Sequence, residues 1–203
     1  MKVLLFNGSP HEHGCTYTAL REAADALEKE GVETEIMWIG TRPVQGCIAC
    51  KSCRKNGKCA FDDGVNELAA RAGEFDGFIF GSPVYYASAS GQICSFMDRL
   101  FYSSSAAFRG KFAAAVVSCR RGGASAAFDR LNKYFTISEM PVVSSRYWNQ
   151  IHGNTREEAL QDAEGLQTMR ILGRNMAWLI KSKAAAELPL PEQESGVSTN
   201  FIR

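Results

Sequence analysis

The sequence lacks a marked excess of charge of either sign. Its 23 Lys and Arg residues nearly balance 22 Asp and Glu residues, for a formal net charge of +1. Proteins that bind nucleic acid normally carry a basic excess or a basic stripe, so we expect no such partner. At the start of the chain the apolar run is limited to residues 3–6, too short for a signal peptide or a membrane span. We therefore expect a cytoplasmic protein that does not bind membranes.

Two common nucleotide-binding fingerprints are also missing. The segment of residues 7–18 contains no Lys or Arg, so it is not the Gly-Lys-Ser/Thr loop that cradles ATP phosphates. It is not Gly-x-Gly-x-x-Gly either. The second expected strand ends in Trp38-Ile39-Gly40, without the acidic residue that a dinucleotide ribose requires. ATP hydrolysis and a tightly held NAD are therefore not expected.

The hydrophobic pattern that is present alternates between strands and helices. With 203 residues, of which 45% are apolar, the chain is long enough for one domain with a sizeable core. We predict strands at residues 2–7, 32–39, 76–81 and 111–118, and a fifth strand that begins with residues 141–144. We predict helices at residues 16–30, after Asp62 or Asp63, after Ser90, at 124–135 and at 156–181. This order predicts an α/β domain whose parallel sheet is covered by helices on both faces.

Ligands of such sheets bind beyond the carboxyl ends of the strands, which here means just after residues 7, 39, 81 and 118. The first of these loops joins a strand to a helix N-terminus and is rich in small and hydroxyl residues. Free backbone N–H groups and the hydroxyls of Ser9, Thr16 and Thr18 can hold a phosphate there. A mononucleotide phosphate fits this loop, and an ordinary turn with Ser/Thr capping is the alternative.

Two loops carry a family resemblance. Gly8-Ser9-Pro10 with Gly14-Cys15-Thr16, and Gly81-Ser82-Pro83-Val84-Tyr85, are similar to loops of the NADPH-dependent FMN reductase family, whose relatives include the iron–sulfur flavoproteins. The chain departs from that pattern at His11, where Arg is common, and at Cys15, where Asn is common. The resemblance implies a flavodoxin-like, doubly wound, five-stranded sheet of order 2-1-3-4-5. It places the FMN-binding domain at residues 1–182, with a cysteine-rich loop at 46–60, and leaves 183–203 as an extended arm.

In that family the first loop holds the FMN phosphate and the second runs along the isoalloxazine ring. The loop after the fourth strand lies beside the ring, where glycines let the backbone approach closely. Arg120 or Arg121 could attract the phosphates of NADPH or an anionic acceptor, or the two could be a solvated pair of surface charges. We expect Trp148 to be a buried structural residue. The residues expected to contact FMN are Ser9, His11, Cys15, Thr16, Tyr17, Thr18, Pro83, Val84, Tyr85, Tyr86, Ala87, Ser88, Cys119, Arg120, Gly122 and Gly123.

Four of the seven cysteines are crowded into one segment, at Cys47, Cys50, Cys53 and Cys59. Four thiolates suit a [4Fe–4S] cluster or a tetrahedral zinc ion, and Gly57 gives the chain freedom to fold the last of them back. The spacing resembles the compact cysteine motif of the iron–sulfur flavoproteins, which favours iron–sulfur over zinc. Four reduced thiols, or a disulfide formed on purification, are the alternatives. The segment follows the second strand, so we expect it at the same sheet edge as the flavin loops.

The resemblance implies an FMN-dependent oxidoreductase. It would pass electrons from NAD(P)H, a transient co-substrate, or from a redox protein, to a small acceptor such as a quinone or free flavin. No side chain is needed as general acid or base, because the flavin carries the chemistry. A non-enzymatic electron carrier of the flavodoxin or iron–sulfur flavoprotein type is the alternative, as is a redox-sensing protein. Relatives are commonly dimers or tetramers, so a homodimer or homotetramer is expected.

Overall fold

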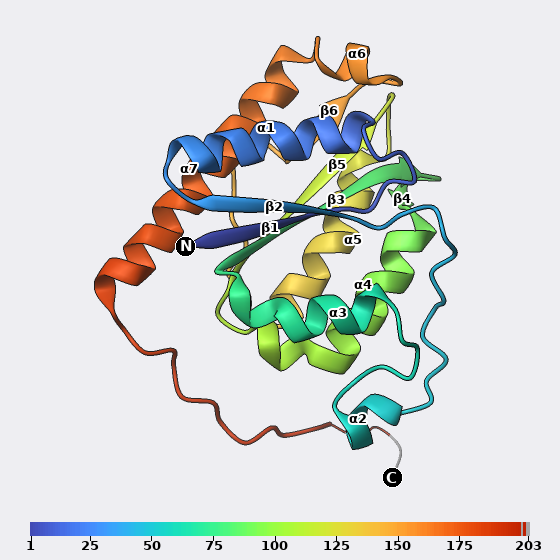
Figure 1. Cartoon of the computed structure of the whole chain (residues 1–203), viewed down its shortest axis with the longest axis vertical. Helices are drawn as coiled ribbons and strands as arrows, with labels where there is room; N and C mark the ends of the chain where they lie inside the picture. The colour runs from blue at the N-terminus through green and yellow to red at the C-terminus, as the bar shows by residue number, and fades with distance from the viewer. Residues whose placement is uncertain (200, 202–203) are drawn as a thin grey trace.

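The computed structural model describes residues 1–199 and 201 and has an α/β architecture (Figure 1). The strands are β1 Lys2–Asn7, β2 Glu33–Trp38, β3 Gly77–Tyr85, β4 Ser88–Ala89, β5 Phe112–Cys119 and β6 Gln150–His152. The α-helices are α1 Cys15–Lys29, α2 Ser52–Asn56, α3 Gly64–Arg71, α4 Gly91–Ser104, α5 Ala124–Ile137, α6 Arg156–Ala159 and α7 Ala163–Ala186. Two short 3-10 turns, Ala72–Glu74 and Ser105–Phe108, follow α3 and α4.

The main sheet has the order β2-β1-β3-β5-β6, and all of its neighbours are parallel. The two-residue β4 pairs antiparallel with the end of β3 and lies off this path, so the predicted fourth and fifth strands are β5 and β6. With that relabelling the predicted flavodoxin-like order is confirmed. The register aligns Asn7 of β1 with Gly81 of β3, which brings the loops that follow them to the same edge.

Period-two alternation along the strands divides the core between the two faces of the sheet. Leu4 and Phe6 pack with the apolar faces of α3, α4 and α5, where most of the buried phenylalanines gather. Val3 and Leu5 pack on the other face with α1 and α7, a thinner layer rich in alanine. Figure 1 shows these two helix layers on opposite sides of the strands. The thin layer lets Gly173 of α7 press against the α1 backbone.

Two predicted elements differ from the structure. Residues 141–144 form a single bridge, between Val142 and Ala113, and the edge strand lies instead at Gln150–His152. The helix predicted at 156–181 is broken, because Asp162 turns the chain and caps α7 through a bond from the Gly165 N–H to its Oδ1 (2.9 Å). The other predicted helix and strand positions agree with the structure to within a few residues.

Helix α7 continues to Ala186, and an extended segment follows it. Arg109 donates to the Pro191 carbonyl (2.7 Å), which fixes the first part of that segment to the body. The predicted arm of residues 183–203 includes residues 200, 202 and 203, which lie outside the described residues. Within residues 1–199 and 201, none of the helices combines the length and the apolar character that crossing a membrane requires.

Candidate functional site

The loop after β1 is held from within by its own polar groups. Asn7 accepts from the Ser9 N–H (3.1 Å), and its amide nitrogen donates to the Glu12 carbonyl (2.9 Å). The Trp38 indole donates to the Ser9 carbonyl (2.8 Å). The Gly8 N–H bonds the Gly81 carbonyl (2.9 Å), and a Cβ at Gly8 would lie 2.8 Å from that same oxygen. Glycine is therefore needed where the first and third loops touch.

The N-terminus of α1 is left open at this loop. Helices α3, α4, α6 and α7 all begin with a side chain that accepts from their first turn, namely Asp63, Ser90, Thr155 and Asp162. Helix α1 begins after Gly14, with no side-chain cap and no acidic residue in its first turn. Its first N–H groups have no intrahelical partners, and the helix dipole favours an anion beside them. This geometry suits a phosphate group.

The loop after β3 closes as a tight hairpin onto β4. Val84 pairs with Ala89 and Tyr85 with Ser88, so Tyr86 and Ala87 form the two-residue turn. Both have left-handed backbone, with φ of 48° and 57°, although neither is glycine. Strain of this kind concentrates at functional sites. Gly123, at φ 91°, lies against this turn, and a Cβ there would be 2.7 Å from the Ala87 Cα, so a larger residue would push the turn away.

These loops surround a cavity of about 700 Å³ at the carboxyl edge of the sheet. A volume of this size is typical of small-molecule and cofactor sites. It lies at the edge that the sequence predicted, where loops after β1, β3, β5 and β6 converge. The predicted residues that line it are Ser9, His11, Cys15, Thr16, Pro83, Val84, Tyr85, Cys119 and Arg120.

The other predicted residues lie around this cavity without lining it. The Tyr17 ring packs edge-on against His13, and the Thr18 hydroxyl donates to the Gly14 carbonyl (3.1 Å). Tyr86 stands fully exposed at the tip of the hairpin, at 106% relative exposure. The remaining ones support the hairpin or the start of α5: Ala87, Ser88, Gly122 and Gly123.

Several lining residues were not predicted from the sequence. Trp38 is the last residue of β2, Ser118 is the second-last residue of β5, and residues 153–156 follow β6. The rule that ligands bind after strand ends would have found residues 153–156, had the last strand been placed at 150–152. The prediction that Trp148 is buried was wrong, because its side chain is half exposed (51%). Asn149 turns inward instead and donates to the Ala115 carbonyl (3.0 Å).

Two thiols line the cavity, and both are held in the neutral form. Burial raises the pKa of Cys15, and burial also raises the pKa of Cys119. The Cys15 Sγ lies 3.2 Å from the Thr155 carbonyl and 3.5 Å from the Gly153 carbonyl. Cys15 thus ties the start of α1 to the segment after β6. A neutral thiol in this position adds no negative charge beside an incoming phosphate.

The four clustered cysteines lie together at the other end of α4. Cys47 and Cys50 are exposed, Cys53 and Cys59 are half-buried, and all four line one small, mainly apolar cavity without any Asp or Glu. Left-handed backbone at Ala49 and Lys51, and at Gly57 as expected, turns the chain between them. In the part of the chain that the structure describes, no three Cys, His, Asp or Glu side chains are close enough for a single metal ion. The donor set of four thiols still fits a cluster, which holds its ligands farther apart than one ion does.

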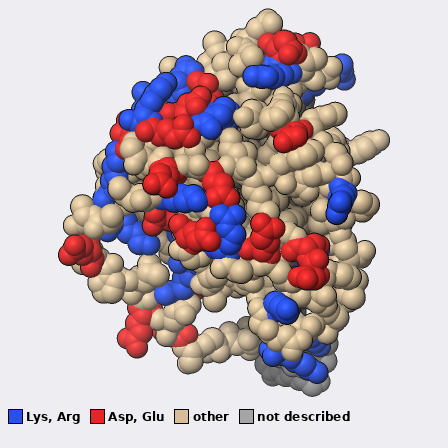
Figure 2. Space-filling view, in the orientation of Figure 1, with Lys and Arg blue, Asp and Glu red and all other residues tan. Residues whose placement is uncertain are grey.

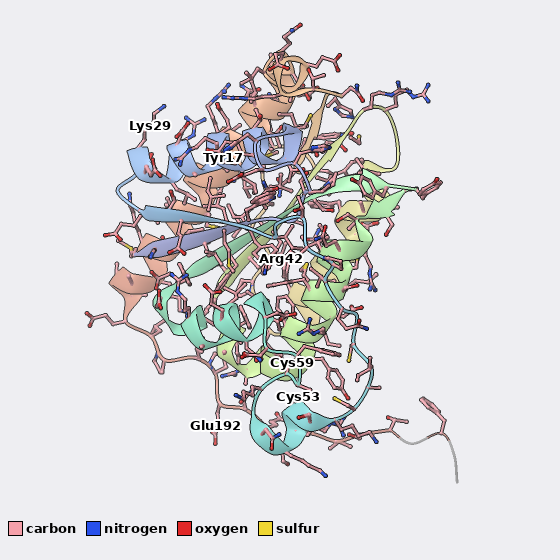
Figure 3. The ribbon with its side chains drawn as sticks, turned by 45° about the vertical axis from the view of Figure 1, so that its right-hand side comes forward. Tyr17, Lys29, Arg42, Cys53, Cys59 and Glu192 are labelled. Carbon is pink, nitrogen blue, oxygen red and sulfur yellow. The ribbon has the colours of Figure 1, made fainter. Side chains whose placement is uncertain are left out.

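The cysteine segment is not beside the flavin loops, contrary to the sequence expectation. Helix α4 meets those loops at its N-terminus, where the Ser90 hydroxyl donates to the Gly8 carbonyl (3.2 Å). The cysteine cavity touches Arg99 and Tyr102, the former nine residues further on, or about 14 Å along the helix. Figure 3 shows Cys53 and Cys59 together near α2, away from Tyr17. The segment leaves the sheet edge because residues 40–51 run out along α4 (Figure 1).

The sheet order and its helix layers define a flavodoxin-like protein, with a cofactor-sized cavity at the carboxyl edge of the sheet. Residues 1–155 match the family model of the NADPH-dependent FMN reductases. The chain belongs to that family, and FMN is the cofactor that the family supports. Oxidoreductase chemistry is the general role of such proteins.

Curated relatives are iron–sulfur flavoproteins. One from Methanocaldococcus jannaschii is 34% identical over 189 residues, covering 89% of this chain and 98% of that protein. One from Methanosarcina thermophila is 28% identical over 173 residues, covering 83% and 90%. Among solved structures, an NADH:FMN oxidoreductase in its apo form aligns with a TM-score of 0.62 at 17% identity, covering 89% of each chain. That last likeness supports the fold alone.

Proposed function

We propose that this protein is an FMN-dependent oxidoreductase that takes electrons from NAD(P)H, or from a protein donor, and passes them to a small acceptor such as a quinone or free flavin. The observation that carries the proposal is the uncapped start of α1, which opens into the same cavity as the strained hairpin of residues 84–89. One element suits a phosphate and the other suits the edge of a flat ring.

The residues divide into those that would hold the phosphate and those that would hold the ring. Ser9, Thr16 and the first N–H groups of α1 would bind the phosphate. Pro83 to Tyr85 would lie along the ring, which supplies hydride and single-electron chemistry when FMN is bound. The chain's own task is to bind and orient the flavin. Arg120 lines the cavity and carries a charge that would attract a nicotinamide phosphate.

A steady-state assay tests the nicotinamide step. The FMN-loaded protein should oxidise NADPH or NADH when a quinone is added. Arg120→Gln should raise the KM for the nicotinamide several-fold with little change in kcat, because its charge acts in binding. Arg121→Gln is the matched control, since Arg121 is exposed and does not line the cavity. Equal KM values in both variants would remove Arg120 from this role, and no turnover with either nicotinamide would remove the enzyme activity.

We also propose that Cys47, Cys50, Cys53 and Cys59 hold a [4Fe–4S] cluster, as the names of the relatives and the shared cavity support. Given the separation along α4, the cluster would exchange electrons with the flavin of a second copy in a homodimer or homotetramer. The exposed Tyr86 at the tip of the hairpin, and the exposed Tyr147 and Trp148 just before β6, are suited to such an interface. Iron and sulfide analysis after anaerobic purification, with the visible spectrum, tests this; a spectrum of flavin alone would refute it.

A carrier that exchanges electrons only with other proteins is the second candidate. Lys51 lines the cysteine cavity, and Arg54, Lys55 and Lys58 lie in the same segment between the cysteines; this basic group favours the carrier. Figure 2 shows this end of the molecule with Lys and Arg gathered together, whereas the charges over α1 and β2 are mixed. Reduction by a small acidic redox protein, without turnover of either nicotinamide, would favour the carrier over the enzyme.

A further inference from the structure

Arg99 is a buried cation that the flavin site does not use. It lies on the third turn of α4, and its side chain is 1% exposed. The guanidinium has five N–H donors, and the structure gives it five hydrogen bonds. Two go to the Asp63 carboxylate, at 2.7 and 2.8 Å. A buried charge of this kind is expensive unless its partners are well placed.

The partners of Arg99 come from both sides of the cysteine segment. Its Nη1 donates to the Gln45 carbonyl (3.2 Å), before the first cysteine. Its Nη2 donates to the Phe61 carbonyl (3.3 Å), after the last cysteine, and the guanidinium lies 4.9 Å from the centre of the Phe61 ring. Its Nε donates to the Cys59 Sγ (3.2 Å). One side chain therefore joins both ends of the segment to α4 and contacts one of its four thiols.

We propose that Arg99 is a positioning residue for the cluster: it holds residues 45–63 closed, so that the four cysteines can take up iron and sulfide, and its Nε–H bond to the Cys59 sulfur raises the reduction potential of the cluster. The proposal rests on the proposed function of the cysteine segment. Hydrogen bonds to cluster sulfurs favour the reduced, more negative state, and this is one of the factors that set such potentials. A positive charge at the same place acts in the same direction.

Lysine cannot take over this role. Its ammonium group has three donors at one point on a flexible stem, whereas the four partners of Arg99 surround a planar fork. Arg99→Lys therefore keeps the charge and loses the joint contact with both ends of the segment. Arg99→Met removes the charge as well and leaves Asp63 without its partner.

Arg54 offers a matched control on the same segment. It lies on α2 and donates to the Tyr102 hydroxyl (3.1 Å); among the described residues its side chain makes no hydrogen bond to a cysteine sulfur or to the ends of the segment. We would compare Arg99→Lys with Arg54→Lys, which both keep the positive charge, and Arg99→Met with Arg54→Met, which both remove it. The FMN content of each variant reports whether the domain is folded, because neither residue lines the flavin cavity.

Two sets of measurements test the inference. In the iron-free, FMN-loaded protein, hydrogen exchange of residues 45–63 should become at least tenfold faster in both Arg99 variants and stay unchanged in the Arg54 variants. After anaerobic reconstitution, Arg99→Lys should bind several-fold less iron and sulfide than Arg54→Lys. The fraction of cluster that does form should titrate at a more negative potential, and Arg99→Met should shift it further than Arg54→Met does.

The outcomes separate this inference from the proposed function. A wild-type protein that takes up no iron and sulfide would refute the cluster, while the exchange rates would still decide whether Arg99 closes the segment. Wild-type uptake with equal uptake, potential and exchange in Arg99→Lys would overturn the inference and leave the cluster standing. If Arg99→Met loses FMN and is unfolded, the Arg99→Lys pair alone decides.

Discussion

The pair of hydroxyls between α1 and β5 provides a quantitative test of the phosphate site. Thr16 Oγ1 and Ser118 Oγ lie 2.8 Å apart, and the two residues are 1% and 4% exposed. Thr16→Val keeps the shape of the side chain but leaves the Ser118 hydroxyl buried without its partner, and Ser118→Ala does the converse. Each should lower the free energy of unfolding of the FMN-free protein by about 1–3 kcal/mol.

The double variant should lower the free energy of unfolding little more than either single variant does, because the second substitution removes a hydroxyl that the first had already left without a partner. We expect a coupling energy of about 1–2 kcal/mol in a double-mutant cycle measured by denaturant unfolding. Thr18→Val combined with Ser118→Ala is the control, since among the described residues the Thr18 hydroxyl bonds only the carbonyl of Gly14, the residue just before its own helix. Those two effects should add. An additive cycle for Thr16 and Ser118 would refute the shared hydrogen bond.

The same pair makes a prediction for the cofactor. Two hydroxyls hold two protons, and their mutual bond uses one, so one donor remains for a ligand in the cavity that both residues line. Losing one hydrogen bond to a phosphate is worth about 1.5 kcal/mol, which corresponds to roughly tenfold weaker FMN binding. Titration of FMN fluorescence measures this. Either single variant still leaves one hydroxyl proton for the ligand, so the double variant of Thr16→Val and Ser118→Ala carries the test. Unchanged affinity in the double variant would show that the phosphate does not lie at this pair.

Two further predictions concern acid stability and the phosphate loop. The hydrogen bond from Arg71 is the main cause that lowers the pKa of Glu35 from 4.5 to about 2. A carboxyl group whose pKa is lower in the folded than in the unfolded protein stabilises the fold above the unfolded pKa, and this stabilisation is lost as pH falls from about 4.5 toward 2. Glu35→Gln should therefore make the free energy of unfolding depend less on pH in that window. An unchanged pH dependence would contradict this. Trp38→Phe removes the indole bond to the Ser9 carbonyl and should weaken FMN binding about fivefold by fluorescence titration. The exposed Trp178, replaced in the same way, should have no effect.

The fold and much of the flavin cavity could be predicted because they depend on local signals. Buried strands read as short apolar runs, and the cap of α4 at Ser90 is visible from its residue type. The rule for parallel sheets then located the cavity from the strand ends alone. The loop after β1 was predicted as a phosphate site from its small and hydroxyl residues, and the structure shows that the helix after it lacks a side-chain cap.

The features that could not be predicted from the sequence depend on contacts between residues far apart in the chain. The last strand was misplaced because β6 is three residues long and is defined by pairing with β5, not by its own composition. That error hid residues 153–156 of the cavity. The cysteine segment was placed at the sheet edge because chain order was the only guide. In the structure, hydrogen bonds to Arg99 join the segment to α4. Arg99 lies about 40 positions further along the chain, and no local sequence pattern indicates that it is buried.

The meeting of both ends of the cysteine segment at Arg99 also bears on how such a protein can change. A segment whose ends are joined forms a closed loop. The entropic cost of closing such a loop grows slowly with its length, by about 0.6 kcal/mol for each doubling. Insertions or altered cysteine spacings between residues 45 and 61 would therefore lower the stability of the sheet and the flavin cavity very little. The segment has the character of an exchangeable cassette, in which a different metal-binding sequence could be grafted onto an unchanged flavin domain.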